Sequence, residues 1–150
     1  MKCFIFDLDG TLADDGHRWH FIERNNDWDA YYAAATGDRP IEHVLVVARS
    51  LHAAGFKICI VTGRSESIRH ETTQWLIEQG LLFDELIMRK KGDRRRNSEL
   101  KLEALHTLRA MGYFPLMAFE DLEPAVKALR EAGLPCAQVK HSADWNVEHP

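Results

Sequence analysis

Short apolar runs alternate with amphipathic stretches that end in glycine, and this alternation constrains the fold of the chain more than any other feature. The apolar runs are as short as strands and lack a period of two, which is typical of strands buried on both faces of a sheet. They cover residues 3–6, 57–61, 86–88, 116–119 and 136–139. The stretches between them carry helical stripes that end at Gly55, Gly80, Gly112 and Gly133. Strands joined by crossover helices predict an α/β fold, a doubly wound parallel sheet of about five strands with helices on both faces.

Local signals predict where some helices begin. Ser98 is a good N-cap for the helix that ends before Gly112, and Pro124 fits the first turn of the last helix. Residues 19–35 have the pattern of one irregular helical segment rich in aromatic side chains. Only about 25 to 30 residues separate the first run from the helix that starts near Ile41, too few for a large lid domain. We therefore expect one domain over residues 1–150 with a minimal cap.

Composition narrows the class of protein. The chain of 150 residues is long enough for one domain with a substantial core. Its net charge of −4 argues against a surface that binds nucleic acid all over, although it allows local basic patches. Three cysteines without the spacing of a zinc site favour buried, reduced thiols. Because no leader and no membrane-spanning run is recognisable, we expect a cytoplasmic protein that does not associate with membranes.

Three of the expected strands end in polar residues of related chemistry. Asp7 and Asp9 follow the first strand, and their i, i+2 spacing directs both carboxylates toward one ligand. The segment 62–64 (Thr-Gly-Arg) follows the second strand, and the pair at 120–121 (Glu-Asp) follows the fourth. Lys101 lies near the beginning of a helix, where anions are favoured. Since ligands of parallel sheets bind beyond the carboxyl ends of the strands, we expect these groups to converge.

The convergent groups suit phosphoryl transfer. Two unpaired carboxylates side by side would repel each other, so the arrangement makes sense mainly around a hard cation such as Mg²⁺. The hydroxyl of Thr62, the amide of Gly63 and the ammonium of Lys101 suit a phosphoryl group. Together they fit hydrolysis through an aspartyl-phosphate, with Mg²⁺ offsetting the charge of the carboxylate nucleophile. An isolated pair of acids, by contrast, is as often a solvated turn.

The ordered motifs resemble those of the haloacid dehalogenase superfamily of phosphohydrolases, over nearly the whole chain and with that superfamily's Rossmann-like sheet. The resemblance implies that Asp7 is the nucleophile and that Asp9 is the general acid and later the base. It implies that Thr62 and Lys101 hold the phosphoryl oxygens. It also implies that Mg²⁺ is bound by Asp7, by the backbone carbonyl of Asp9 and by Asp121, with Glu120 acting through a metal-bound water.

Within that superfamily the chain is similar to the 3'-phosphatase domains of the phage-type polynucleotide kinase/phosphatase family. The shared features are Arg18, the basic stretch 89–95 leading to Lys101, the pattern at 133–139 and the pair at 144–145 (Asp-Trp). The resemblance implies removal of 3'-phosphates from DNA or RNA ends in nucleic-acid repair, with these substrate ligands: Gly63, Arg18, Arg64, Arg89 and Arg95. Guanidinium groups match phosphate in geometry. The chain departs from that family at Leu122, where an arginine is usual, and at Glu120, where an aspartate is usual.

Several alternatives remain open in the sequence. The basic stretch 89–96 is either a platform for a phosphodiester backbone or a solvated loop. The aromatic side chains of residues 19–32 favour helical packing over stacking on bases. The substrate could instead be a small molecule, as for a 5'-nucleotidase, and a non-catalytic phosphate- or nucleic-acid-binding module is the remaining reading. No kinase motif is recognisable, so the phosphatase is expected to stand alone, and the sequence gives no indication of the oligomeric state.

Overall fold

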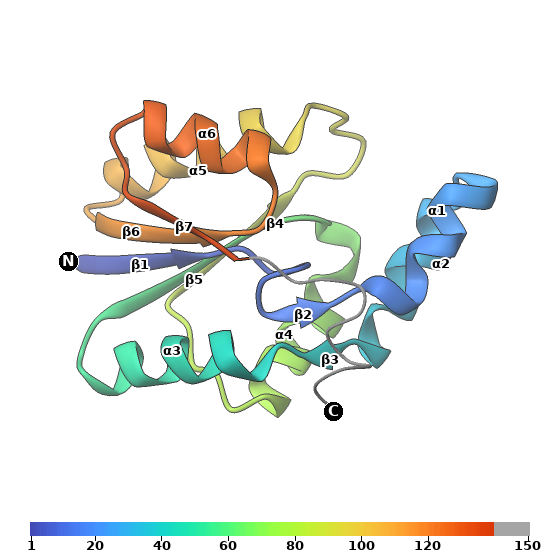
Figure 1. Cartoon of the computed structure of the whole chain (residues 1–150), viewed down its shortest axis with the longest axis horizontal. Coiled ribbons are helices and arrows are strands. Elements are labelled where there is room, and N and C mark those ends of the chain that lie inside the picture. The colour runs from blue at the N-terminus through green and yellow to red at the C-terminus, as the bar shows by residue number, and fades with distance from the viewer. Residues whose placement is uncertain (140–150) are drawn as a thin grey trace.

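The centre of the molecule is a parallel sheet of five strands. The computed structural model describes residues 1–139 of the chain (Figure 1). The strand order is β5-β4-β1-β6-β7, and every pairing within this sheet is parallel. The strands are β1 (Lys2–Phe6), β4 (Lys57–Ser65), β5 (Glu85–Arg89), β6 (Phe114–Glu120) and β7 (Cys136–Gln138). All five apolar runs are therefore strands, and the predicted α/β sheet is confirmed.

Helices cover both faces of the sheet, as the doubly wound prediction requires. The chain runs outward from β1 through β4 to β5 and then returns to the other side of β1 for β6 and β7. Figure 1 shows the four crossover helices in two layers, with α3 and α4 on one face and α5 and α6 on the other. Their bounds are α3 (Glu42–Ala53), α4 (Arg69–Glu78), α5 (Asn97–Ala110) and α6 (Glu123–Glu131).

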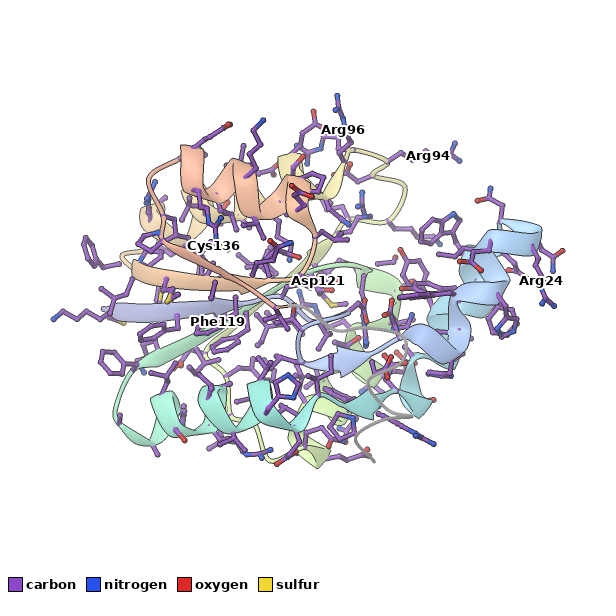
Figure 2. All side chains as sticks on the ribbon, in the orientation of Figure 1. Arg24, Arg94, Arg96, Phe119, Asp121 and Cys136 are labelled. Carbon is purple, nitrogen blue, oxygen red and sulfur yellow. The ribbon has the colours of Figure 1, made fainter. Side chains whose placement is uncertain are left out.

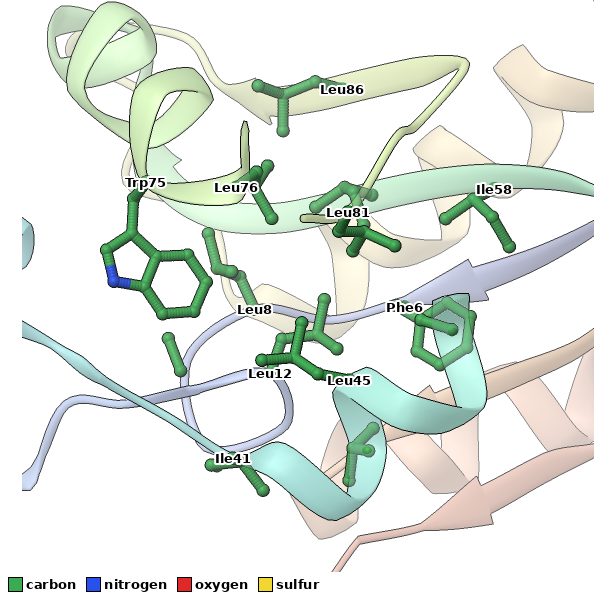
Figure 3. Packing of buried hydrophobic residues seen from close by; sticks show 14 of the residues in the cluster. Phe6, Leu8, Leu12, Ile41, Leu45, Ile58, Trp75, Leu76, Leu81 and Leu86 are labelled. Atoms are coloured by element: carbon green, nitrogen blue, oxygen red, sulfur yellow. The ribbon is translucent and has the colours of Figure 1, made fainter. Parts of the chain in front are cut away.

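Alternate residues of the central strands build two separate cores. On the side of α3 and α4, Phe6 and Ile60 pack with Leu45 and Trp75 (Figure 3). On the opposite side, a second cluster joins strand residues to those of α5 and α6; it includes Ile5, Val61, Leu105 and Val126. Each fully buried side chain of this kind contributes about 1.5–3 kcal/mol of transfer free energy. The three cysteines are free and buried, as predicted.

A small helical insert lies between β1 and α3 and extends past the carboxyl ends of the strands (Figure 1). Its base is a two-stranded antiparallel ribbon of β2 (Ala13–Asp14) and β3 (Arg39–Pro40). We call residues 16–37 the insert; they contain α1 (Trp19–Asn25) and α2 (Trp28–Ala33) with a 3₁₀ turn at each end. The single helical segment predicted for 19–35 is broken because Asn26 adopts left-handed backbone angles, with φ of 50°.

One predicted helix start is wrong and another is confirmed. α5 begins at Asn97 rather than after Ser98. The Glu99 carboxylate accepts a hydrogen bond of 3.0 Å from the backbone nitrogen of Arg96, and this bond caps the N-terminus of the helix at Arg96. Pro124 lies in the first turn of α6, as predicted. Asp144 and Trp145 lie outside the described residues. No helix within residues 1–139 is long and apolar enough to span a membrane.

Candidate active site

The polar motifs identified in the sequence meet where the strands of the sheet end. β1 passes directly into Asp7, whose backbone nitrogen donates to the carbonyl of Phe119 in β6 at 2.9 Å. This hydrogen bond brings the acids after β1 next to the acids after β6, and Figure 2 shows Asp121 at that end of β6. The carboxyl ends of β1, β4 and β6 thus form one polar edge of an otherwise apolar sheet.

Asp7 is held by a lysine and a threonine in a buried position. Lys101 on α5 approaches Asp7 Oδ1 with its Nζ at 2.6 Å, and Thr11 Oγ1 donates to Asp7 Oδ2 at 3.2 Å. The same ammonium donates to the carbonyl of Val61 and lies 3.0 Å from Glu120 Oε2. Lys101 is only 5% exposed, so its charge is balanced almost entirely by Asp7 and Glu120.

Three carboxylates form a group that fits a divalent cation. Asp7, Glu120 and Asp121 each place one oxygen within 4.8 Å of the other two. Asp121 Oδ1 is buried and has no hydrogen-bond partner among the described residues, which is the state of an atom that lacks a ligand. Oxygen-only donors are those that Mg²⁺ prefers. Residue 10 has to be a glycine for Asp121 to occupy this position. Gly10 has a φ of +81°, and a Cβ there would overlap the Asp121 carboxylate.

The protonation of these acids reflects their crowding. Burial and the charge of Glu120 raise the pKa of Asp7 to about 7, although Lys101 opposes the shift. Burial and the charge of Asp7 raise the pKa of Asp121 to about 10. The pKa of Lys101 is raised by Asp7 and Glu120 in spite of burial. Around neutral pH the ion-free group therefore retains protons that a cation would have to displace.

Mg²⁺ binding is accordingly expected to depend on pH. Protons compete for Asp7 and Asp121, whose pKa values are about 7 and about 10, so binding displaces two protons below about pH 7 and one above it. The affinity should therefore rise by about 100-fold per pH unit below about pH 7 and by about tenfold per unit between about pH 7 and 8. Calorimetry in buffers of different ionisation enthalpy measures both the affinity and the protons released. Asp121→Asn, which removes one ligand and its proton, should weaken binding and flatten this dependence. An affinity that stays constant over this range would contradict the assignment of the ligands.

Asp9 lies apart from the three clustered acids and is held by two arginines. Arg64 donates from Nη2 to Asp9 Oδ1 at 2.7 Å and from Nε to both carboxylate oxygens at 3.1 Å. Arg18 donates to Asp9 Oδ1 from its Nη2, also at 2.7 Å. Burial opposes the charge of Asp9, but Arg64 and Arg18 outweigh it and lower the pKa of this carboxyl. Asp9 is thus an oriented, ionised carboxylate whose side chain is about 20% exposed.

The structure buries both Arg18 and Arg64, and of these two Arg64 borders the cavity described below whereas Arg18 does not. Their exposed fractions are 0% and 1%, and both donate to Asp38 as well as to Asp9. Arg18 also donates to the carbonyl of Tyr31 at 3.1 Å and lies 4.1 Å from the centre of that ring. In this arrangement the two guanidiniums orient Asp9, and their contact with a substrate remains a prediction.

Asp38 is the functional residue that sequence reasoning missed. Its fully buried carboxylate accepts from Arg18, Arg64 and His17 over distances of 2.7–2.8 Å. Its backbone carbonyl also accepts from the indole of Trp75 at 2.9 Å. Nothing in the sequence around residue 38 marks it, because its partners come from distant segments and it follows no predicted strand.

The end of β4 contributes a hydroxyl and a close backbone approach. Thr62 is buried, and its Oγ1 accepts from the backbone nitrogen of Arg64 at 3.1 Å, which leaves its O–H as a donor. Gly63 packs so tightly against α5 that a Cβ would overlap Asn97 Oδ1. Gly63 lies at the wall of the cavity described below, whereas Thr62 does not line it.

Arg89 and Arg95 shape the basic loop between β5 and α5. Arg89 donates to the carbonyls of Gly63, Asp93 and Arg95 and to Asn97 Oδ1, at 2.6–3.1 Å. Every nitrogen of this guanidinium is therefore engaged in fastening the loop to β4 and α5. Arg95 pairs with Asp93 at 2.8 Å and with Glu103. Both arginines border the cavity, and their role as substrate ligands stays a prediction.

A cavity of about 900 Å³ opens above the acids. Its floor contains Asp7, Asp9 and Asp121, and its walls come from the insert and from the loop 89–96. A buried carboxylate beside a lysine, an oriented second carboxylate and a group of carboxylates that fits a cation, all at the carboxyl ends of a parallel sheet, are typical of phosphohydrolases of the haloacid dehalogenase class.

Comparison with known proteins narrows this class. The profile of the family described as the polynucleotide kinase PNKP phosphatase domain matches residues 1–143. The chain therefore belongs to this family and is a phosphatase, as the sequence motifs predicted. None of the curated protein sequences compared with the chain matches it.

Solved structures agree with the family. A chain of a Pnkp1/Rnl/Hen1 complex is 27% identical with a TM-score of 0.79, covering 94% of this chain and 46% of its own length. A chain of a Pnkp1/Rnl/Hen1 RNA repair complex is 26% identical with a TM-score of 0.79, covering 95% of this chain and 43% of its own length. This chain thus spans less than half the length of either. A class C acid phosphatase from Bacillus anthracis shares the fold, at 12% identity and a TM-score of 0.66, with 96% of this chain and 69% of that one covered.

Proposed function

We propose that the protein hydrolyses 3'-phosphates at polynucleotide ends, with Mg²⁺ and through an aspartyl-phosphate on Asp7. The observation that carries the proposal is the buried Asp7–Lys101 pair beside Asp121, on the floor of a cavity with a basic wall. Membership in the PNKP phosphatase-domain family supports the 3'-end as the substrate. The description of one similar structure as an RNA repair complex supports the inclusion of RNA ends.

The proposed chemistry has two steps. An oxygen of Asp7 forms a bond to phosphorus while the bond from phosphorus to the 3'-oxygen breaks, and Asp9 protonates that leaving oxygen. Water then attacks the aspartyl-phosphate, Asp9 takes the proton of the water, and the bond between phosphorus and Asp7 breaks to release phosphate. Lys101, which lines the cavity, holds a phosphoryl oxygen, and the motif assigns a second oxygen to the O–H of Thr62, the neighbour of Gly63 in the cavity wall. Mg²⁺ bound by Asp7 and Asp121 would reduce the repulsion between the carboxylate and the anionic phosphate.

Arg18 and Arg64 suit Asp9 to the second of these steps. They fix its orientation and keep it ionised, which is the form that acts as base in the second step. For the first step Asp9 has to take up a proton, which its partly exposed carboxylate can obtain from solvent. The arginines thus act on the reaction through Asp9, and we regard them as positioning residues.

A panel of substrates tests the proposal. Phosphate release is measured with Mg²⁺ on a 3'-phosphorylated oligonucleotide, as DNA and as RNA, on its 5'-phosphorylated isomer, and on 3'- and 5'-mononucleotides. We expect the 3'-phosphorylated oligonucleotides to have the highest kcat/KM, and chelation of the metal to stop the reaction. A preference for the 5'-phosphorylated isomer would refute the proposal.

A small-molecule phosphatase is the second candidate. Its supporting observation is the cavity itself, because about 900 Å³ lies within the size range of pockets for single small ligands, roughly 300–1,000 Å³. On the same panel this function predicts faster release from mononucleotides than from oligonucleotides. Binding of oligonucleotides without turnover of any phosphomonoester would instead indicate a non-catalytic module.

A further inference from the structure

The walls of the active-site cavity differ in chemistry from one another. One wall, from the insert, presents Trp19, Trp28 and Tyr32, and we call it the aromatic wall. The other wall comes from the loop before α5. We call it the basic wall and define it as Lys90, Lys91, Arg94 and Arg96. Figure 2 shows Arg94 projecting from this loop toward the side of the molecule where α1 lies. A ligand that extends out of the site passes between the two walls.

The aromatic wall is exposed yet fixed in place. Trp19 and Trp28 are 40% and 47% exposed, so packing leaves a large part of each indole free to contact a ligand. The Trp28 indole donates to Asn26 Oδ1 at 3.1 Å, lies edge-on to Tyr31 at 5.5 Å between ring centres, and lies 6.0 Å from the ring of Tyr32. A ring held by three neighbours loses little entropy when a planar ligand stacks on it.

The basic wall carries charges that the protein itself does not neutralise. Its four members are exposed, and none of them forms an ion pair within residues 1–139. Arg95, in the same loop, is by contrast paired with Asp93 and Glu103. Because Arg89 fastens the loop to β4 and α5, these charges are held at the cavity rather than spread along a loose segment. Such charges are available to phosphates of a bound chain.

The acidic residues of the cavity give the ligand a direction. Asp15 and Asp29 line the cavity on the side of the insert, so phosphates are disfavoured beside the aromatic wall. Uncharged bases can lie there, while the phosphates face the basic wall. Bases paired in a duplex are stacked on each other, so only an unpaired strand offers base faces to the tryptophans.

We infer that the cavity binds a single-stranded polynucleotide behind its terminal phosphate, with bases stacked on Trp28 and Trp19 and internucleotide phosphates on Lys91 and Arg94. The inference rests on the proposed function and specifies the form of its substrate. It assigns recognition to nucleotides upstream of the 3'-phosphate, and it predicts that an end within a duplex binds more weakly than the same end as a single strand.

Binding to the Asp7→Asn protein tests the inference, because this variant leaves the ligand intact. The probe is a 5'-fluorescein-labelled, 3'-phosphorylated hexanucleotide, followed by fluorescence anisotropy. Trp28→Ala should weaken binding about 5- to 100-fold, as expected for one lost base stack. Trp28→Phe, which keeps a ring, should recover most of the affinity, and this recovery separates stacking from damage to the fold. Phe114→Ala is the matched control, since Phe114 is 64% exposed and lies outside the cavity.

Salt dependence tests the basic wall separately. The double variant Lys91→Gln, Arg94→Gln should lower the slope of log affinity against log salt by about 1.4, at about 0.7 per phosphate of a single strand. Arg109→Gln, which changes an exposed arginine of α5 outside the cavity, should leave the slope unchanged.

Equal affinity for a hexanucleotide and a mononucleotide, or no effect of Trp28→Ala, would overturn the inference while the 3'-phosphatase activity could still be present. Absence of phosphate release from every 3'-phosphorylated substrate would refute the proposed function, and the binding series, which needs no turnover, would still decide the inference.

Discussion

Asp7→Asn is expected to lower the rate of phosphate release by about 10⁴-fold or more, to the background of the assay. The amide of asparagine cannot form the aspartyl-phosphate, so no compensating residue restores the first step. Acid quenching during turnover should trap a phosphorylated wild-type protein and no phosphorylated variant. Appreciable turnover by Asp7→Asn would refute the assignment of the nucleophile.

The same variant should fold at least as well as the wild type, which separates loss of chemistry from loss of structure. Asp7 has a pKa of about 7 in the ion-free protein, above the 3.8 of an unperturbed aspartate. A carboxyl whose pKa is raised by folding stabilises the fold fully below its unfolded pKa, and this stabilisation is lost as the pH rises through about 7. Asp7→Asn should therefore stabilise the metal-free protein more at pH 8 than at pH 5.

The ion pairs of Lys101 support that expectation. In Asp7→Asn its ammonium keeps Glu120 at 3.0 Å and the carbonyl of Val61, so no buried charge is left unpaired. Urea denaturation at both pH values, without metal, measures the effect. Glu78→Gln is the control, because Glu78 is exposed on α4 and should change neither activity nor stability. A large loss of stability at pH 8 would mean that Asp7 has a structural role instead.

The fold could be predicted from the sequence because its signals are local. Each buried strand is a short apolar run, and left-handed glycines such as Gly55 and Gly133 end the intervening helices. The insert was predicted less well, since its two helices are separated only by the backbone angles of Asn26. The ribbon of β2 and β3 was not predicted, because strands of two residues carry no periodic pattern.

The residues that the structure brings together were predicted mainly where they follow strands, with Lys101, near the start of α5, as the exception. Asp7, Gly63 and Asp121 occupy the ends of β1, β4 and β6, and the rule for parallel sheets brings such positions together. Burial, in contrast, depends on tertiary packing. Neither the complete enclosure of Arg18 nor the fastening of the basic loop by Arg89 follows from the order of residues along the chain.

The network around Asp38 gives the second large effect. Asp38→Ala should destabilise the protein by about 3–5 kcal/mol, because it leaves two buried guanidiniums close together with Asp9 as their remaining anionic partner. A loss of this size is a large part of the roughly 5–15 kcal/mol that stabilises a domain. Asp38→Asn should cost less, since the amide oxygen still accepts one of the hydrogen bonds.

Activity should fall together with stability in both Asp38 variants, because Arg18 and Arg64 would no longer hold Asp9 in one orientation. Urea denaturation measures the free energy of unfolding, and kcat with a 3'-phosphorylated oligonucleotide, taken where each variant is fully folded, measures the effect on Asp9. Glu23→Ala is the control, an exposed acid of the insert outside the cavity whose loss should change stability by less than about 0.5 kcal/mol. If Asp38→Ala unfolds at the same urea concentration as Glu23→Ala, the buried ion network does not stabilise the fold, and Asp9 must owe its orientation to other contacts.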